Sequence, residues 1–179
     1  VPSLRLNTLK ISPANALQKW PAQNNWQIEP VPFCDAGWQI TAAGADISRT
    51  LEYLQGYYYI QGAASMLPVE MFRFDGRTRP LVLDMAASPG GKTTHLACKL
   101  NDRGLIVAND TSTSRIPALQ ANLNRWGTVC AAITRYPGEA FGRWYPDKFD
   151  YILLDAPCSA EILRESGHRR TRPTSRRLA

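Results

Sequence analysis

Residues 81–94 read LVLDMAASPGGKTT, an apolar run that ends in an acid and continues into a glycine-rich turn. The apolar residues 81–83 suit a buried strand of a parallel sheet, and Asp84 stands at the carboxyl end of that strand. Residues 89–91, Pro-Gly-Gly, allow a tight turn before a helix predicted over residues 92–100. Because backbone N–H groups in such a turn can hold a nucleotide-like ligand or a carboxylate, the stretch predicts a strand, a binding loop and a helix.

Three kinds of glycine-rich loop compete for this turn. A Walker loop needs G-x-x-x-x-G-K-[ST], and Ala86 stands where its first glycine is required. The dinucleotide fingerprint G-x-G-x-x-G is absent. The loop after the first strand of an S-adenosylmethionine methyltransferase fits, and so does an ordinary strand-to-helix turn. Because short glycine motifs are common, a second motif has to decide.

That second motif is FDYILLDAPCS at residues 149–159. Residues 152–154 suit another buried strand, and Asp155, Pro157 and Cys158 add an acid, a rigid ring and a thiol after it. Open α/β sheets bind ligands outside the carboxyl ends of their strands. We therefore expect Asp155 and the acid of the first motif to face one crevice.

Together the two motifs resemble the RNA cytosine-5 methyltransferases of the Sun and nucleolar-protein family, above all bacterial members that act on small-subunit ribosomal RNA. Three more segments look like parts of that family in the same order: RLNTLKIS, YIQGAASMLP and ANDTSTSR, at residues 5–12, 59–68 and 108–115. We expect the likeness to run from about Leu4 to about Glu161 and then to stop. The resemblance implies S-adenosylmethionine as cofactor, small-subunit ribosomal RNA as the RNA partner, and methylation of carbon 5 of cytosine.

For the cofactor, the resemblance implies a site at the carboxyl ends of the strands. Asp110, just past the second predicted strand, matches the family's ribose-binding acid. Gln61 and Ser65 match residues that close one side of the cofactor pocket, although a plain connection between subdomains explains them equally well. The implied cofactor-binding residues are Asp84, Ala86, Ala87, Ser88, Pro89, Gly90, Gly91, Lys92, Asp110 and Asp155.

The family's chemistry needs two thiols, because carbon 5 of cytosine is a poor nucleophile. One thiolate adds to carbon 6, which makes carbon 5 reactive, and a second thiol assists release of the product. The family assigns addition to the cysteine of a Thr-Cys motif and release to the cysteine after Asp-Ala-Pro. The resemblance thus implies Cys158 as the release residue, Asp155 at the cytosine edge and Lys92 near the target base.

Two departures from the family pattern bear on activity. Pro137 and Gly138 stand where the family carries an acid followed by glycine, so one adenine-side contact is lost. After Cys158 the chain continues as SAEILRESGHRRTRPTSRRLA and holds no Thr-Cys pair, so the attacking thiol is missing. We expect the truncated front part of a methyltransferase, inactive or impaired by itself, and leave open whether this chain is an enzyme.

Two other interpretations stay open. Asp155-Ala156-Pro157 suits a different S-adenosylmethionine methyltransferase, one that acts on an amino nitrogen. Alternatively, the chain is a remnant that binds cofactor or RNA and catalyses nothing. Product analysis separates carbon from nitrogen targets, whereas cofactor binding without turnover identifies the remnant.

The net charge of +6 is concentrated at the end of the chain. Residues 160–179 hold six arginines against two glutamates, or +4, which leaves +2 for the rest. A solvated tail explains this composition more simply than an RNA-binding arm. No apolar run reaches transmembrane length and no signal pattern starts the chain, so we expect a cytoplasmic monomer without membrane contact.

Four cysteines, Cys34, Cys98, Cys130 and Cys158, form no CxxC pair and have no metal-like spacing. This pattern argues against a metal site and against a disulfide framework. We expect free thiols, with Cys98 and Cys130 as small core residues and Cys34 in a loop without a partner.

The order of predicted elements gives the fold class. We expect an α/β chain with a Rossmann-like methyltransferase sheet, incomplete on its C-terminal side, and a small N-terminal α/β subdomain. The expected divisions are an RNA-associated subdomain over residues 1–45, the partial methyltransferase domain over 46–160, and a disordered Arg-rich tail over 161–179.

Two helix boundaries are predicted from capping residues and proline. A helix that begins after Ser12 should end at Pro21. Ser112 or Ser114 should cap a second helix that runs to Arg125.

Overall fold

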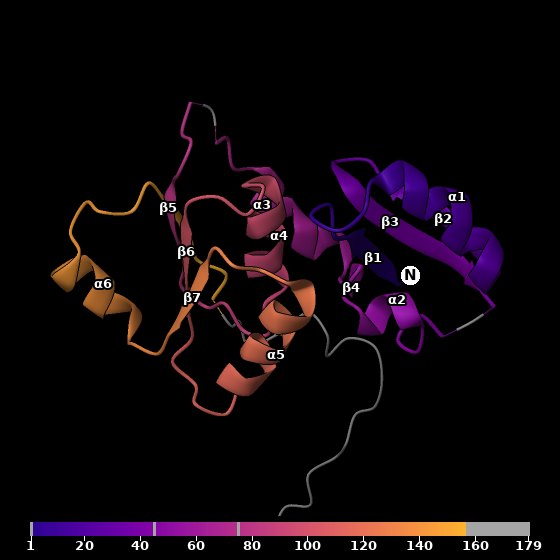
Figure 1. Cartoon of the computed structure of the whole chain (residues 1–179). Helices are drawn as coiled ribbons and strands as arrows, with labels where there is room; N and C mark the ends of the chain where they lie inside the picture. Colours follow the sequence, from indigo (N-terminus) through magenta and orange to yellow (C-terminus); the bar gives the residue numbers. More distant parts are fainter. Residues whose placement is uncertain (1, 45, 75, 157–179) are drawn as a thin grey trace, which may run out of the picture.

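The computed structural model describes residues 2–44, 46–74 and 76–156 of the chain. Within these residues the chain forms two four-stranded sheets, an N-terminal one and a C-terminal one, with helices between them (Figure 1). Cys158 and the predicted tail over 161–179 lie outside the described residues. The described part contains no helix whose length and apolar character would let it cross a membrane.

The N-terminal sheet is antiparallel and has the strand order β2-β3-β1-β4. Its strands are β1 (Ser3–Leu6), β2 (Trp26–Val31), β3 (Cys34–Ala43) and β4 (Tyr58–Ile60). Two helices belong with it, α1 (Pro13–Asn24) and the short α2 (Leu51–Leu54). Ala16 and Trp20 of α1 pack with Trp26 and Tyr58 in an aromatic core, which confirms a small N-terminal α/β subdomain.

Helix α1 extends further than predicted. It continues through Pro21 and ends at Asn24, so the prediction that Pro21 ends this helix is wrong. The proline removes one intrahelical hydrogen bond, and the burial of Ala16 and Trp20 against the sheet offsets that loss.

Strand β4 extends the N-terminal sheet beyond residue 45. Leu4, Arg5 and Leu6 of β1 pair with its three residues. The chain therefore stays with the N-terminal sheet as far as Ile60, and the division at residue 45 remains a prediction.

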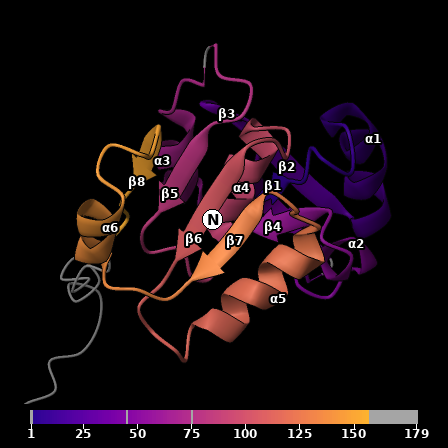
Figure 2. The same cartoon turned by 60° about the vertical axis from the view of Figure 1, so that its left-hand side comes forward.

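The second sheet is parallel and has the strand order β7-β6-β5-β8 (Figure 2). Its elements in chain order are the 3-10 helix η1 (Ala63–Met66), α3 (Leu67–Glu70), β5 (Leu81–Asp84), α4 (Gly91–Lys99), β6 (Leu105–Asn109), α5 (Ile116–Trp126), β7 (Ala131–Thr134), α6 (Gly138–Trp144) and β8 (Tyr151–Leu153). Helices α4 and α5 lie on the face toward the N-terminal sheet, and α6 lies on the opposite face (Figure 1). The alternation of strand and helix confirms the Rossmann-like α/β class.

The order of the parallel strands reverses at β5. Strands β6 and β7 add to one side of β5, and β8 adds to the other, with Asp84 paired to Leu153. Ligands of such sheets bind outside the carboxyl ends of the strands at this reversal. The crevice expected from the two motifs lies at this point of the fold.

The start of α5 differs from the prediction. The helix begins at Ile116, and no side chain caps it. The hydroxyl groups of Ser112 and Ser114 bond to each other at 2.9 Å, and the Ser112 amide donates to Asp110. Because both serines have other partners, the predicted serine cap is wrong.

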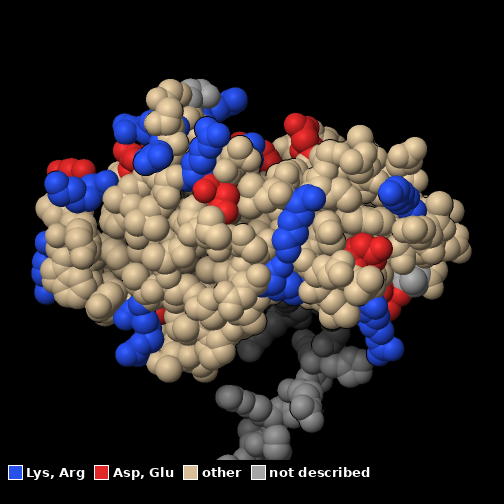
Figure 3. Space-filling model, viewed as in Figure 1, with Lys and Arg blue, Asp and Glu red and all other residues tan. Residues whose placement is uncertain are grey.

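The surface carries scattered charge and, at β8 among other places, exposed apolar side chains. On the face shown in Figure 3, Asp and Glu lie between the Lys and Arg side chains, which form no single patch there. At the edge strand β8, Ile152 is 53% exposed, and Leu154 just after it is 62% exposed. Apolar side chains are thus open to solvent beside α6.

Candidate active site

Asp84 ends β5 and is fully buried. Its Oδ2 accepts a 2.7 Å hydrogen bond from Thr93 Oγ1, and its Oδ1 has no partner among the described residues. Burial raises the pKa of Asp84 to about 6, against the lowering effects of the Thr93 bond and the Lys92 charge. A buried carboxylate oxygen without a partner suits a ligand that brings a donor, such as the ammonium group of an amino acid.

The turn after β5 depends on glycine where it enters α4. Gly90 has φ = +106°, a conformation that side chains disfavour, and a Cβ there would lie 3.2 Å from Leu119 of α5. The turn is also fixed from α5, because Asn122 Nδ2 donates to the Pro89 carbonyl at 2.8 Å. These contacts hold the turn in one shape at the helix N-terminus.

A cavity of about 270 Å³, here called the loop cavity, lies between this turn and the end of β4. Gln61 is fixed in its wall, since Oε1 accepts from Arg5 at 2.9 Å and Nε2 donates to the Ser65 carbonyl at 3.0 Å. Gln61 and Ser65 therefore line the cavity as well as connecting the two sheets. The predicted residues that the cavity brings together are Gln61, Ser65, Ala86, Ala87, Ser88, Pro89, Gly91, Lys92 and Asp155.

Three predicted cofactor residues, Asp84, Gly90 and Asp110, do not belong to the described walls of the loop cavity. Asp110 is 2% exposed, accepts from the Ser88 amide at 3.3 Å and pairs with Arg115 at 3.4 Å. Arg115 in turn donates to the Ser88 carbonyl at 2.5 Å. Asp110 thus stabilises the turn through Ser88 and Arg115. Its contact with a ribose remains a prediction.

Lys92 and Asp155 form an ion pair at the loop cavity, with Nζ and Oδ2 2.5 Å apart. The Lys92 side chain is 17% exposed and that of Asp155 is 52% exposed, so the carboxylate faces solvent at the edge of the cavity. Two of the three predicted catalytic residues therefore lie together, and the third, Cys158, falls outside the described residues.

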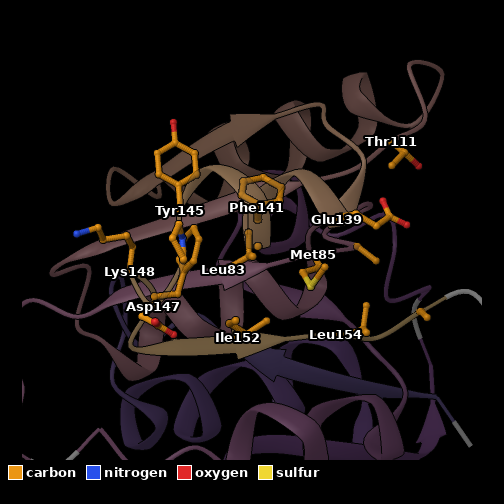
Figure 4. Close-up of a pocket in the computed structure, with 16 residues that line it drawn as sticks. Leu83, Met85, Thr111, Glu139, Phe141, Tyr145, Asp147, Lys148, Ile152 and Leu154 are labelled. Carbon is orange, nitrogen blue, oxygen red and sulfur yellow. The ribbon is translucent and has the colours of Figure 1, made fainter.

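A larger cavity of about 790 Å³, here called the α6 cavity, shares Ala86 with the loop cavity as a lining residue. Figure 4 shows this larger cavity. Met85, Phe141 and Glu139 are among its walls, and most of its lining is apolar. Pro137 precedes the first turn of α6, and a Cβ on Gly138 would lie 2.7 Å from Met85 Cε. Pro137, which stands where the resemblance implies an acid, thus directly precedes a residue of the cavity wall, and the exposed Glu139 lines the same cavity.

Arg5 was missed by the sequence analysis. It is fully buried, and Nη2 donates to the Gly91 carbonyl at 2.9 Å and to Thr94 Oγ1 at 2.7 Å, while Nε donates to Gln61. Burial lowers the pKa of Arg5, and its guanidinium lies 4.8 Å from the Trp126 ring centre. Arg5 is a positioning residue that ties the wall of the loop cavity to α4. The alternation of Leu4 and Leu6 around it was the only sequence signal.

The described cysteines lie away from both cavities. Cys34 begins β3 and is buried, so the prediction of a loop residue without a partner is wrong. Cys130 is a buried core residue as predicted, and Cys98 is partly buried. Burial raises the pKa of Cys34 and of Cys130 to about 12, which leaves both thiols protonated at neutral pH.

The fold and the loop at the strand reversal define the class of Rossmann-like methyltransferases. Two family models match the sequence: 16S rRNA methyltransferase RsmB/F over residues 73–175, and the N-terminal domain of 16S rRNA methyltransferase RsmF over residues 1–63. The chain belongs to the RsmB/F family of 16S rRNA methyltransferases. The first match continues to residue 175, further than the predicted end of the likeness near Glu161.

Curated relatives agree with this family. Ribosomal RNA small subunit methyltransferase F of Photobacterium profundum is 44% identical over 169 residues, which cover 92% of this chain and 35% of that protein. The protein of the same name from Escherichia coli (strain SMS-3-5 / SECEC) is 46% identical over 162 residues, or 89% of this chain and 34% of that protein. The chain spans about a third of the length of these relatives.

Solved structures support the same fold. A methyltransferase homolog from Pyrococcus horikoshii matches with a TM-score of 0.80 and 35% identity, over 88% of this chain and 50% of that one. NSun6 from Pyrococcus horikoshii, solved with SFG, matches with a TM-score of 0.72 over 87% of this chain and 62% of that one. At 21% identity, this second match bears on the fold alone.

Proposed function

We propose that the two cavities bind S-adenosylmethionine and that the parent protein methylates carbon 5 of cytosine in small-subunit ribosomal RNA. The observation that carries the cofactor assignment is the loop cavity, in which seven predicted cofactor residues meet. Asp84, whose buried Oδ1 has no partner among the described residues, interacts electrostatically with two of them, Lys92 and Asp155. A donor from the amino acid part of the cofactor would satisfy that oxygen, and amides of the turn would receive its carboxylate.

The α6 cavity is our candidate for the adenosine part. It adjoins the loop cavity at Ala86, and its mostly apolar walls, with the acids Glu139 and Asp147, suit a flat ring that carries an amino group. Asp110 lies behind Ser88 near this junction and is our candidate for the ribose contact. When bound, S-adenosylmethionine supplies the methyl group.

The target base would enter at Asp155 and Lys92. The Asp155 carboxylate is half-exposed beside the loop cavity and can accept a hydrogen bond from a cytosine edge. Lys92 holds that carboxylate in place through their ion pair. Cys158 follows Asp155 by three residues and would assist product release.

For this chain alone we propose that no 5-methylcytosine forms. The sequence holds no Thr-Cys pair, and Cys34 and Cys130 are buried with raised pKa values. Neither can supply the thiolate that adds to carbon 6. Labelled methyl transfer to small-subunit ribosomal RNA, followed by nucleoside analysis, tests this, and 5-methylcytosine that disappears in Cys158→Ser would overturn it.

Two alternatives remain. One is an amino-directed methyltransferase, because the half-exposed Asp155 would also suit an amino target. The other is a remnant that binds cofactor or RNA without catalysis. A methylated nitrogen in the same nucleoside analysis would favour an amino-directed enzyme. A binding remnant would be favoured if the chain binds cofactor but forms no product. In that case, a longer chain that includes a Thr-Cys motif should also fail to form product. Because ribosomal RNA is the proposed substrate, we also propose that the protein acts in the cytoplasm. That the protein is a monomer stays a prediction.

Calorimetry with S-adenosylmethionine is the test of the cofactor site. We expect binding to the folded chain, and binding at least about fivefold weaker in Asp84→Asn, because one charged partner of the ligand is lost. Asp46→Asn is the matched control, since Asp46 bonds only to its neighbours Ser48 and Arg49 outside the crevice. The absence of heat at millimolar ligand, with folding confirmed by circular dichroism, would contradict the assignment.

A further inference from the structure

Three side chains with metal-binding atoms meet where the N-terminal sheet contacts α3 and α4. Cys34 comes from the start of β3, Glu70 from the end of α3, and His95 from the middle of α4. Cys34 Sγ lies 3.9 Å from His95 Nε2, and this nitrogen lies 2.9 Å from Glu70 Oε1. All three ligand atoms lie within 4.8 Å of one another.

The spacing suits a small tetrahedral ion. Zinc bonds of about 2.0–2.3 Å to sulfur, nitrogen and oxygen place ligand atoms about 3.3–3.7 Å apart. The observed separations of 2.9 Å and 3.9 Å fall on either side of that range, so shifts of well under 1 Å would complete the geometry. Thiolate, imidazole and carboxylate are also the three ligand types that zinc accepts in proteins.

Burial and charge fit the same ion. Cys34 is 1% and His95 is 2% exposed, and Glu70 keeps its second oxygen, Oε2, on Lys99 at 2.7 Å. His95 Nδ1 has no partner among the described residues, so the polar contacts of the ring are on its Nε2 side, toward Cys34 and Glu70. One thiolate and one carboxylate neutralise a divalent cation, which limits repulsion from Lys99 and from the nearby Arg5.

Solvent can reach the cluster. A cavity of about 160 Å³ borders it and is lined by Glu70, His95, Cys98 and Lys99 among others. This space is large enough for a water molecule as a fourth ligand. The cluster therefore offers three protein ligands and one open position.

We propose that Cys34, Glu70 and His95 bind one zinc ion that links the N-terminal sheet to α3 and α4. On binding, the Cys34 thiol loses its proton to solvent and its sulfur bonds to the ion. His95 binds through Nε2 and carries its ring proton on Nδ1, and Glu70 binds through Oε1. The site is separate from the proposed cofactor cavities, so its test is independent of methyl transfer.

Cobalt(II) is the probe, because it binds at zinc sites and a thiolate bound to it gives a charge-transfer absorption band. After treatment of the full chain with a chelator, we expect one equivalent of cobalt chloride to give a thiolate-to-cobalt band that zinc chloride removes. Cys34→Ser should abolish the band. Cys130→Ser, at a second buried thiol in a separate core cluster, should retain it. No band, or the same band in Cys34→Ser, would overturn the proposal.

Variants of the other two ligands keep the proposal testable if Cys34→Ser fails to fold. Glu70→Gln and His95→Gln should each weaken zinc binding at least about tenfold in competition with a coloured chelator. Circular dichroism establishes that each variant is folded. Zinc affinity that is unchanged in both folded variants would also overturn the assignment.

Discussion

Asp84 gives the chain a pH dependence that can be measured without any ligand. Its pKa is about 6 in the folded chain and 3.8 is its ordinary value, so between these values the folded state holds a proton that the unfolded state releases. The Asp84 contribution to stability should therefore fall by about 3 kcal/mol as pH rises from about 4 to about 6. Burial lowers the pKa of His95 to about 4, so His95 gives an opposite slope over nearly the same range. The stability of Asp84→Asn relative to the native chain should therefore rise by about 3 kcal/mol across this range, and the variant should be the more stable form above pH 6, as measured by urea unfolding of both proteins.

The exposed Asp46 supplies the comparison for this experiment. Its pKa is lowered by hydrogen bonds from Ser48, so Asp46→Asn should leave the slope between pH 4 and 6 in place. A stability difference between Asp84→Asn and the native chain that stays constant from pH 4 to pH 6 would contradict the assignment to Asp84. Asp84→Asn should thus have opposite effects on two quantities. It should raise the free energy of unfolding above pH 6 and lower the affinity for S-adenosylmethionine measured by calorimetry.

Arg5 is the second prediction at this scale. Arg5→Met leaves Gln61 Oε1 without this donor and removes one of the donors to the Gly91 carbonyl, which keeps Thr94 Oγ1, so unfolding should require about 2–4 kcal/mol less. Both acceptors border the loop cavity, and the folded variant should also bind S-adenosylmethionine at least about fivefold more weakly. Arg49→Met, at an exposed arginine paired only with Asp46, should change neither quantity. Unaltered affinity in Arg5→Met would reduce Arg5 to a purely structural residue.

Single residues also show where sequence analysis works and where it stops. The loop residues and Asp155 were predictable, because strand ends of one parallel sheet must meet at one edge. Arg5 was not, because its partners stand 56 to 89 positions away and alternation in β1 cannot say which helix covers that side. Cys34 was judged by spacing along the chain, and spacing cannot show that Glu70 and His95 fold against it.

At the scale of elements, we expect the start of α6 to set how tightly the adenine part of S-adenosylmethionine binds. Pro137 precedes the helix at the rim of the α6 cavity, where a carboxylate is expected from the resemblance. Pro137→Asp should tighten S-adenosylmethionine binding by about fivefold, the worth of one hydrogen bond. Pro137→Ala removes the ring without adding an acceptor, so equal affinities of the two variants in calorimetry would contradict this role.

The strands and helices of the parallel sheet were predicted well, because each apolar run is followed by turn residues and a helical pattern. The errors lie at positions where tertiary contacts outweigh local preference. Packing of Trp20 against the N-terminal sheet extends α1 beyond Pro21, and the hydroxyl groups of Ser112 and Ser114 bond to each other and not to an amide of α5. β4 is only three residues long, and its pairing with a strand more than fifty residues earlier has no local signature.

At the scale of the whole molecule, the apolar area at β8 should govern solubility. Ile152 and Leu154 are more than half exposed beside the α6 cavity, and an edge strand with apolar side chains favours association. Ile152→Lys should lower light scattering on concentration, because a charge on an edge strand opposes pairing. Val129→Lys, at a residue 83% exposed before β7, is the comparison. If Val129→Lys lowers scattering equally, net charge and not this edge is responsible.

The loop cavity is built from two segments of the chain, which limits how these segments can be exchanged between relatives. Its wall at Tyr59, Gln61 and Gly62 belongs to the segment matched by the N-terminal family model, whereas the turn and Lys92 belong to the segment matched by the other. Neither segment therefore contains a complete binding site. A chimera that joins this N-terminal segment to the second segment of a relative must also match Arg5 to its acceptors on α4, so the two parts have to be exchanged as a pair.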